Sequence, residues 1–102
     1  MEEPFDQATA RGFILAILDG SGMTVFTRRA KEAFLENEMT SADAVNVLRG
    51  GLITKGAPHA SGWMYRAQTR RMIVEFSFRG QARASTAEPN ELVIENASRN
   101  NR

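Results

Sequence analysis

Cysteine is absent from this chain of 102 residues, and histidine occurs once. Without cysteine the chain can form no disulfide and has no thiolate for catalysis. Transition-metal sites usually combine several imidazole or thiolate ligands, so a single histidine argues against such a site. We therefore expect neither a bound metal ion nor a cofactor.

Long apolar segments are also missing. The longest apolar run, Phe13–Leu18, has six residues, whereas about 20 are needed to cross a bilayer. The first residues, Met1–Asp6, include two glutamates and do not have the basic start of a secretory signal. We therefore expect a cytoplasmic protein that does not associate with a membrane.

The net charge of +1 conceals an uneven distribution along the chain. Residues 1–45 have four basic and eight acidic side chains, which gives −4, and residues 46–102 have nine basic and four acidic ones, which gives +5. Eleven of the thirteen basic residues are arginine, whose planar guanidinium group matches phosphate oxygens. The asymmetry predicts an anionic partner such as nucleic acid; the alternative is a charged sheet face that is simply solvated.

Three segments in the first half have the apolar spacing of amphipathic helices. We expect helices over residues 6–19, 28–37 and 41–49. Asp6 and Thr27 are suited to begin the first two, because their side-chain oxygens can accept hydrogen bonds from the first turn. Gly50-Gly51 can end the third. Residues 23–26 are expected to be a short extended link between the first two helices.

The second half has the composition of strands and turns. We expect strands over residues 52–55, 63–68, 70–79 and 91–97, with a loop over residues 56–62 and a flexible tail over residues 98–102. In the third of these strands, Met72, Val74, Phe76 and Phe78 alternate with Ile73, Glu75 and Ser77 and predict one buried face. The chain is therefore expected to be a single α+β domain. Two or three N-terminal helices would pack on a twisted antiparallel sheet of about four strands.

No common catalytic motif is present: the sequence has no phosphate-binding loop, nucleophile elbow or dinucleotide fingerprint. It does concentrate cations and aromatic side chains in one stretch, at Lys55, His59, Trp63, Tyr65, Arg66, Arg70 and Arg71. Trp63 and Tyr65 could stack on bases. RNA cleavage without a metal ion needs a proton acceptor, a proton donor and cations beside the phosphate, and this stretch contains all three.

Each of these residues also has a purely structural interpretation. His59 would be an exposed loop residue, and Trp63 would pack in the core. Tyr65 would be a half-buried strand residue. Arg70 and Arg71 would point to opposite faces of a regular strand, so at most one would face the site. Glu75 would be either solvated or the base of a cleft on the exposed sheet face.

A family resemblance covers the segment from Thr27 to Arg99. The run TRRAKEAFLENEMTSADAVNVLRGGLI, the later GWMYR and the closing ELVIENASR resemble the MqsR-like members of the RelE toxin superfamily and a neighbouring family of uncharacterised domains. The resemblance implies the fold shared by barnase, EndoU, colicin-type ribonucleases and RelE. It also implies metal-independent endonucleolytic cleavage of mRNA, free or on the ribosome, and an antitoxin as partner.

The resemblance also assigns roles to particular residues. Lys55 matches a catalytic lysine, Tyr65-Arg66 a Tyr-Arg strand element, and Arg99 a basic residue near the end of the family pattern. Gly62 and Met72 stand where relatives have Gln and an active-site Tyr. The full set of expected catalytic residues is Lys55, His59, Tyr65, Arg66 and Arg99. The expected RNA-binding residues are Trp63, Arg70, Arg71 and Arg83.

Two further hypotheses remain beside the toxin. The same fold without a working acid–base pair would be an RNA- or protein-binding module, which could be encoded on a mobile element. Alternatively, the apolar predicted helix over residues 6–19 would dock on another chain and produce an oligomer.

Overall fold

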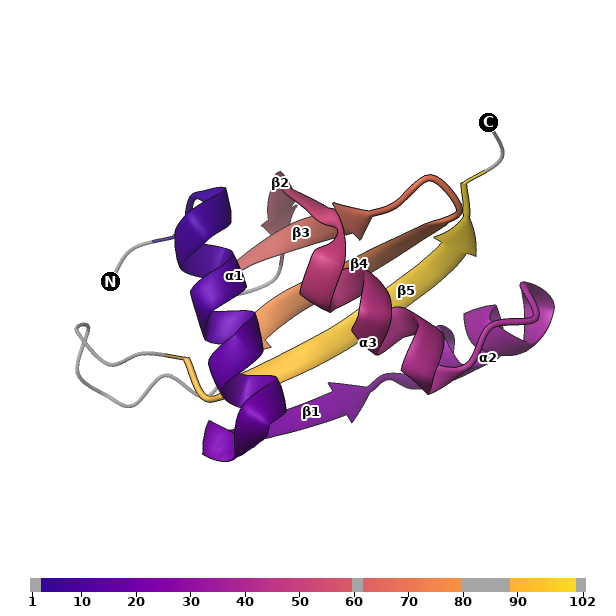
Figure 1. Ribbon diagram of the computed structural model, residues 1–102, viewed down its shortest axis with the longest axis horizontal. Coiled ribbons are helices and arrows are strands. Elements are labelled where there is room, and N and C mark those ends of the chain that lie inside the picture. Colours follow the sequence, from indigo (N-terminus) through magenta and orange to yellow (C-terminus); the bar gives the residue numbers. More distant parts are fainter. Residues whose placement is uncertain (1–2, 60–61, 80–88, 101–102) are drawn as a thin grey trace.

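Among the residues that the structure describes, the first part of the chain contains three α-helices and one short strand, and four strands follow in the second part. The computed structural model describes residues 3–59, 62–79 and 89–100. The elements are, in chain order, α1 (Gln7–Ala16), a π-helical turn (Ile17–Ser21), β1 (Met23–Phe26), α2 (Arg28–Glu36), α3 (Ser41–Gly50), β2 (Leu52–His59), β3 (Gly62–Gln68), β4 (Met72–Arg79) and β5 (Glu91–Arg99). This is an α+β fold, as the sequence predicts (Figure 1).

One mixed sheet contains the five strands, in the order β1-β5-β4-β3-β2. Neighbours from β2 to β5 are antiparallel, whereas β1 runs parallel to β5. The prediction of a wholly antiparallel sheet of about four strands is therefore wrong, because residues 23–26 form an edge strand and not a link. Since β1 lies between α1 and α2, the helices also do not form one N-terminal block.

Helix α2 continues along β5 where β1 ends. The Thr27 N–H donates to the Ile94 carbonyl (3.1 Å), and its hydroxyl donates to the Glu95 carbonyl (3.2 Å). The same hydroxyl accepts from the Ala30 N–H and caps α2. α2 then packs against β5, beyond the end of β1 (Figure 1). The outer edge of β5 is thus covered by β1 in its first half and by a helix in its second half.

Three strand ends differ from the prediction because long-range pairing decides them. β2 continues through residues 56–59, predicted as a loop, since they pair with the start of β3. Pro58 is tolerated there because an edge strand does not need its missing N–H. β5 continues through residues 98–99, predicted as a flexible tail, since they pair with the start of β4. β4 begins only at Met72, after a turn over residues 69–71.

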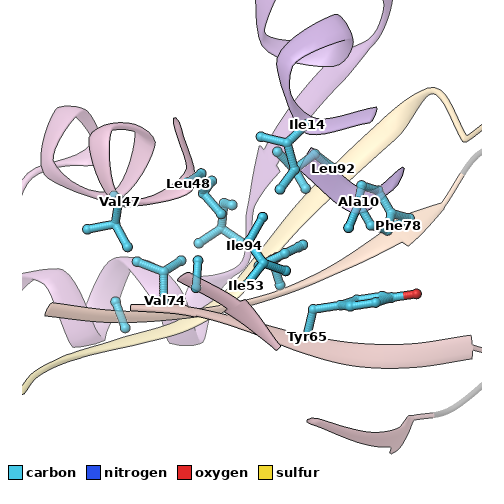
Figure 2. Packing of buried hydrophobic residues seen from close by; sticks show 14 of the residues in the cluster. Ala10, Ile14, Val47, Leu48, Ile53, Tyr65, Val74, Phe78, Leu92 and Ile94 are labelled. Carbon is cyan, nitrogen blue, oxygen red and sulfur yellow. The ribbon is translucent and has the colours of Figure 1, made fainter. Parts of the chain in front are cut away.

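The core fills the space between the sheet and the two helices α1 and α3 that lie across one of its faces (Figure 1). Figure 2 shows Ile14 of α1 and Leu48 of α3 above Val74 and Ile94 of the sheet, all four fully buried. The predicted alternation in β4 is confirmed, since Val74 is joined in the core by Phe76 and Phe78. The apolar stripe of α1 and the turn after it is likewise buried in the chain's own core: Ala10, Phe13, Ile14 and Ile17.

The end of α3 is held by α1. Arg11 donates to the carbonyls of Arg49 (2.7 Å) and Gly51, where a cation is favoured by the negative end of the helix dipole. Gly51 also lies close to other backbone atoms. A Cβ atom there would be 2.7 Å from the Val47 carbonyl oxygen and 2.8 Å from that of Gln68, whereas a Cβ atom on Gly50 would have no atom within 4 Å.

These two adjacent glycines provide a matched test of the fold. We expect Gly51→Ala to lower the free energy of unfolding by about 1–3 kcal/mol, because the added methyl group would overpack fixed backbone atoms. Gly50→Ala should raise it by about 0.5–1 kcal/mol, because alanine loses less conformational freedom on folding. Urea unfolding of the two variants measures both changes, and equal losses would contradict the packing at Gly51.

Candidate functional site

The face of the sheet opposite α1 and α3, which we call the second face, has a polar row across four strands. Thr54, Arg66, Glu75 and Asn96 are successive cross-strand partners from β2 to β5. Cross-strand partners share a face, and neighbours along a strand alternate between faces. Because Tyr65 faces the core, Arg66 and its row face the other way.

Glu75 is the centre of this polar row. Its Oε2 lies 3.5 Å from Nη2 of Arg66, and its Oε1 accepts a hydrogen bond from Asn96 at 3.3 Å. The side chains of Arg66 and Glu75 are 48% and 30% exposed. An ion pair with this exposure contributes little to stability. It does place a carboxylate and a guanidinium group together at an accessible surface.

The connection between β3 and β4, Thr69–Arg71, forms what we call the arginine turn. The Thr69 hydroxyl accepts from the N–H groups of Arg71 and Met72, both at 3.2 Å, and the Thr69 N–H donates to the Met72 carbonyl at 2.9 Å. These hydrogen bonds fix the turn, and Arg70 and Arg71 are exposed at its tip. Within the described ranges, neither guanidinium group has an acidic partner.

A groove of about 590 Å³ adjoins the arginine turn, and we call it the turn groove. It is lined by Leu52, Gln68, Thr69, Arg70 and Asn100. The Asn100 amide N–H donates to the Thr69 carbonyl at 3.0 Å, which orients that side chain. Leu52 is 56% exposed and is the cross-strand partner of Gln68. The volume lies within the range of small-ligand sites, roughly 300–1,000 Å³.

The structure does not bring the predicted catalytic residues together. Lys55 is the cross-strand partner of Tyr65 and therefore shares its face, with the Lys55 ammonium 5.9 Å from the centre of the Trp63 ring. Arg66 follows Tyr65 in β3 and points to the second face. Lys55 and Arg66 are thus turned away from each other by the alternation of the strand.

Tyr65 has a structural environment. Its ring is fully buried and stacks on Phe76, with ring centres 5.5 Å apart. Its hydroxyl donates to Glu3 at 2.6 Å and accepts from the Phe5 N–H at 3.1 Å. Burial, reinforced by the hydrogen bond to Glu3, raises the pKa of the Tyr65 phenol well above its ordinary value. The phenol is therefore protonated at neutral pH, so in acid–base catalysis it could donate a proton but not accept one.

Arg99 is engaged by the backbone at the end of α2. Its Nε donates to the Asn37 carbonyl at 2.9 Å, and its Nη2 donates to the Glu38 carbonyl at 3.2 Å. These bonds tie the end of β5 to the loop between α2 and α3. Two of its donor groups are thus used inside the molecule.

The remaining predicted residues fall in different places. Trp63 is partly buried and packs against the core, so it is not a free stacking platform. His59 lies in β2, where its backbone pairs with that of Gly62. Arg83 lies outside the described residues. Of the predicted RNA-binding residues, Arg70 and Arg71 are the two that lie side by side, at the arginine turn.

Four residues that line the turn groove were not among the predicted site residues: Leu52, Gln68, Thr69 and Asn100. Gln68 could have been found from the sequence, because it shares strand parity with Arg66. Leu52 gave no such indication, since an apolar residue that begins a strand is normally assigned to the core. Asn100 belongs to the segment predicted as a tail, and only the pairing of β5 with β4 places it beside Thr69.

In residues 3–59, 62–79 and 89–100, no helix is long and apolar enough to cross a membrane. The same residues contain no group of three or more His, Asp or Glu side chains that could hold a metal ion. Comparison with protein-family models, curated proteins and solved structures finds no match. The function must therefore be inferred from the residues of this chain.

The environment of Tyr65 predicts a particular dependence of stability on pH. An unfolded tyrosine ionises near pH 10, whereas folded Tyr65 has a raised pKa. Its contribution to stability is therefore complete below about pH 10 and is lost as the pH rises further. We expect Tyr65→Phe to lower the free energy of unfolding by about 1 kcal/mol at neutral pH and to reduce the loss between about pH 10 and 11.

Urea unfolding at a series of pH values measures both effects. Tyr65 is the sole tyrosine of the chain, so the difference between the two proteins reports on this hydroxyl. Identical alkaline slopes for the wild type and Tyr65→Phe would contradict the buried, hydrogen-bonded phenol.

Proposed function

We propose that this protein binds single-stranded RNA and that the arginine turn contacts the phosphates. The proposal depends on one observation: Arg70 and Arg71 are exposed beside the turn groove and have no neutralising carboxylate among the described residues. Guanidinium groups match phosphate oxygens in shape and charge. The amides of the groove suit the edges of unpaired bases, which single strands present and duplexes conceal.

Two properties of the sequence support the same function. The excess of basic residues falls in the second half of the chain, which contains the arginine turn. The resemblance to RNA-cleaving toxins also covers this half. RNA binding needs only the phosphate and base contacts, so it does not require the dispersed residues Lys55, Tyr65 and Arg66 to converge.

The first test removes the two arginines. Arg70→Ala/Arg71→Ala should weaken the binding of a labelled single-stranded RNA. It should also flatten the plot of log K against log salt by about 1.4, because each lost phosphate contact on a single strand removes about 0.7 from the slope. Fluorescence anisotropy over a series of NaCl concentrations measures both quantities.

A matched control is available on α2. Arg28→Ala/Arg29→Ala removes the same charge from exposed positions, of which Arg28 lies 3.4 Å from Glu32. This variant should retain the salt slope of the wild type. Equal losses in both double variants would indicate a general charge effect and would contradict a specific contact at the arginine turn.

A second candidate function is metal-independent cleavage of mRNA by a RelE/MqsR-like toxin, which the Arg66–Glu75 pair favours. Glu75 offers a carboxylate as proton acceptor, and Arg66 a cation for the charge that develops on the phosphate. The pair lies one row from Gln68 on the second face, so a strand held in the turn groove would extend over it. An antitoxin, and the ribosome if cleavage occurs there, would then be the partners.

Cleavage is tested by incubating the protein with mRNA in EDTA. If Glu75 is the proton acceptor, Glu75→Gln should lower the cleavage rate by about 10²–10⁴-fold while RNA affinity is kept. Lys55→Ala/Arg66→Ala should also lose activity. Glu32→Gln, on the surface of α2, should cleave like the wild type. If the wild type binds RNA without cutting it, the binding module stands and the nuclease is rejected.

A further inference from the structure

We infer that the turn groove receives one unpaired base, adenine or cytosine, whose exocyclic amino group lies beside an unprotonated ring nitrogen on the pairing edge, in preference to uracil. This inference rests on the proposed RNA binding and assigns the groove the selection of the base. The arginine turn contributes the phosphate contacts, which do not depend on base identity.

The floor of the site is provided by the sheet itself. Leu52, Gln68 and Ile73 are cross-strand partners on the second face, so an aliphatic side chain lies on either side of the Gln68 amide. Leu52 is 56% exposed. This exposure costs solvation free energy unless an apolar surface covers it. The flat face of a base would cover Leu52 while its edge meets the amide.

The polar groups around the groove favour an amino group on the ligand. One of the two side-chain N–H groups of Asn100 donates to the Thr69 carbonyl, which orients the amide and leaves its oxygen available as an acceptor. Gln68 has no hydrogen-bond partner for its amide among the described residues and can both donate and accept. The amino group of adenine or cytosine can give one hydrogen to each amide oxygen, and the adjacent ring nitrogen can accept from the Gln68 amide.

Uracil does not match this pattern. It offers a single ring N–H between two carbonyl oxygens, so it can give a hydrogen to only one of the two amide oxygens and leaves the other without a donor from the base. A polar group left unpaired in a contact costs more than the hydrogen bond itself contributes. The charge of the site is also complementary, because Arg70 lines the groove and can contact the phosphate of the same nucleotide.

The test compares labelled oligo(A), oligo(C) and oligo(U) of equal length with the full chain at one salt concentration. We expect oligo(A) and oligo(C) to bind about tenfold more tightly than oligo(U), the size of one good amide–base pair. Gln68→Met, which keeps the volume but removes the amide, should abolish the preference. Asn46→Leu, which removes an exposed side-chain amide from α3 and not from the groove, should keep it. Thermal unfolding checks that both variants are folded.

The outcomes separate the two proposals. If all three oligonucleotides bind equally and Gln68→Met has no effect, the base-selective groove is rejected while RNA binding stands. If no oligonucleotide binds, the proposed RNA binding is rejected. Titration with AMP and UMP by NMR then still examines the groove alone. Chemical-shift changes at Gln68 and Asn100 with AMP but not with UMP would support the base site, and none with either would overturn it.

Discussion

The hydrogen bonds of the Tyr65 hydroxyl hold the N-terminal segment against the sheet. The hydroxyl accepts from the Phe5 N–H and donates to Glu3, so the chain is fixed immediately before Asp6 caps α1. Phe5 then packs edge-to-face against the rings of both Phe13 and Phe78, with ring centres 5.0 Å and 5.6 Å away. Without these bonds a buried phenol and a buried backbone N–H would both lack partners. The position of α1 on the sheet depends on this contact, and α1 in turn covers one end of the core.

The same contact decides which residues can meet a ligand. Because Tyr65 points into the core (Figure 2), the pleat of β3 turns Arg66 and Gln68 to the second face. Lys55 is the cross-strand partner of Tyr65 and therefore lies on the face that α1 and α3 cover. The stretch of cations and aromatics that looks like one site in the sequence is thus divided by the strand between a structural face and an accessible one. The aromatic rings belong to the first, and the arginines of β3 and its turn to the second.

The features that could be predicted from the sequence are those set by local patterns, and the features that were missed are set by long-range strand pairing. The helices and the alternation in β4 depend on local caps and on periodicity, which a sequence displays directly. The parallel pairing of β1 with β5 was missed because it joins residues 23–26 to residues 91–94, and no local pattern marks such a distant partner. The turn groove was missed for the same reason, since Leu52 and Asn100 meet through three strand pairings. Strand parity could have separated Lys55 from Arg66, but only once their partners were known.

Charge compensation distinguishes the two candidate functions on the second face. Arg66 already has Glu75 at 3.5 Å, and Glu75 also holds Asn96, so an arriving phosphate would have to compete with a carboxylate for Arg66. Arg70 and Arg71 have no such competitor among the described residues, and a phosphate would meet two positive charges there. In the proposed RNA binding, the first contact is therefore expected at the arginine turn. The Arg66–Glu75 pair would act only on a strand already held there, so binding can persist in this fold where cleavage does not.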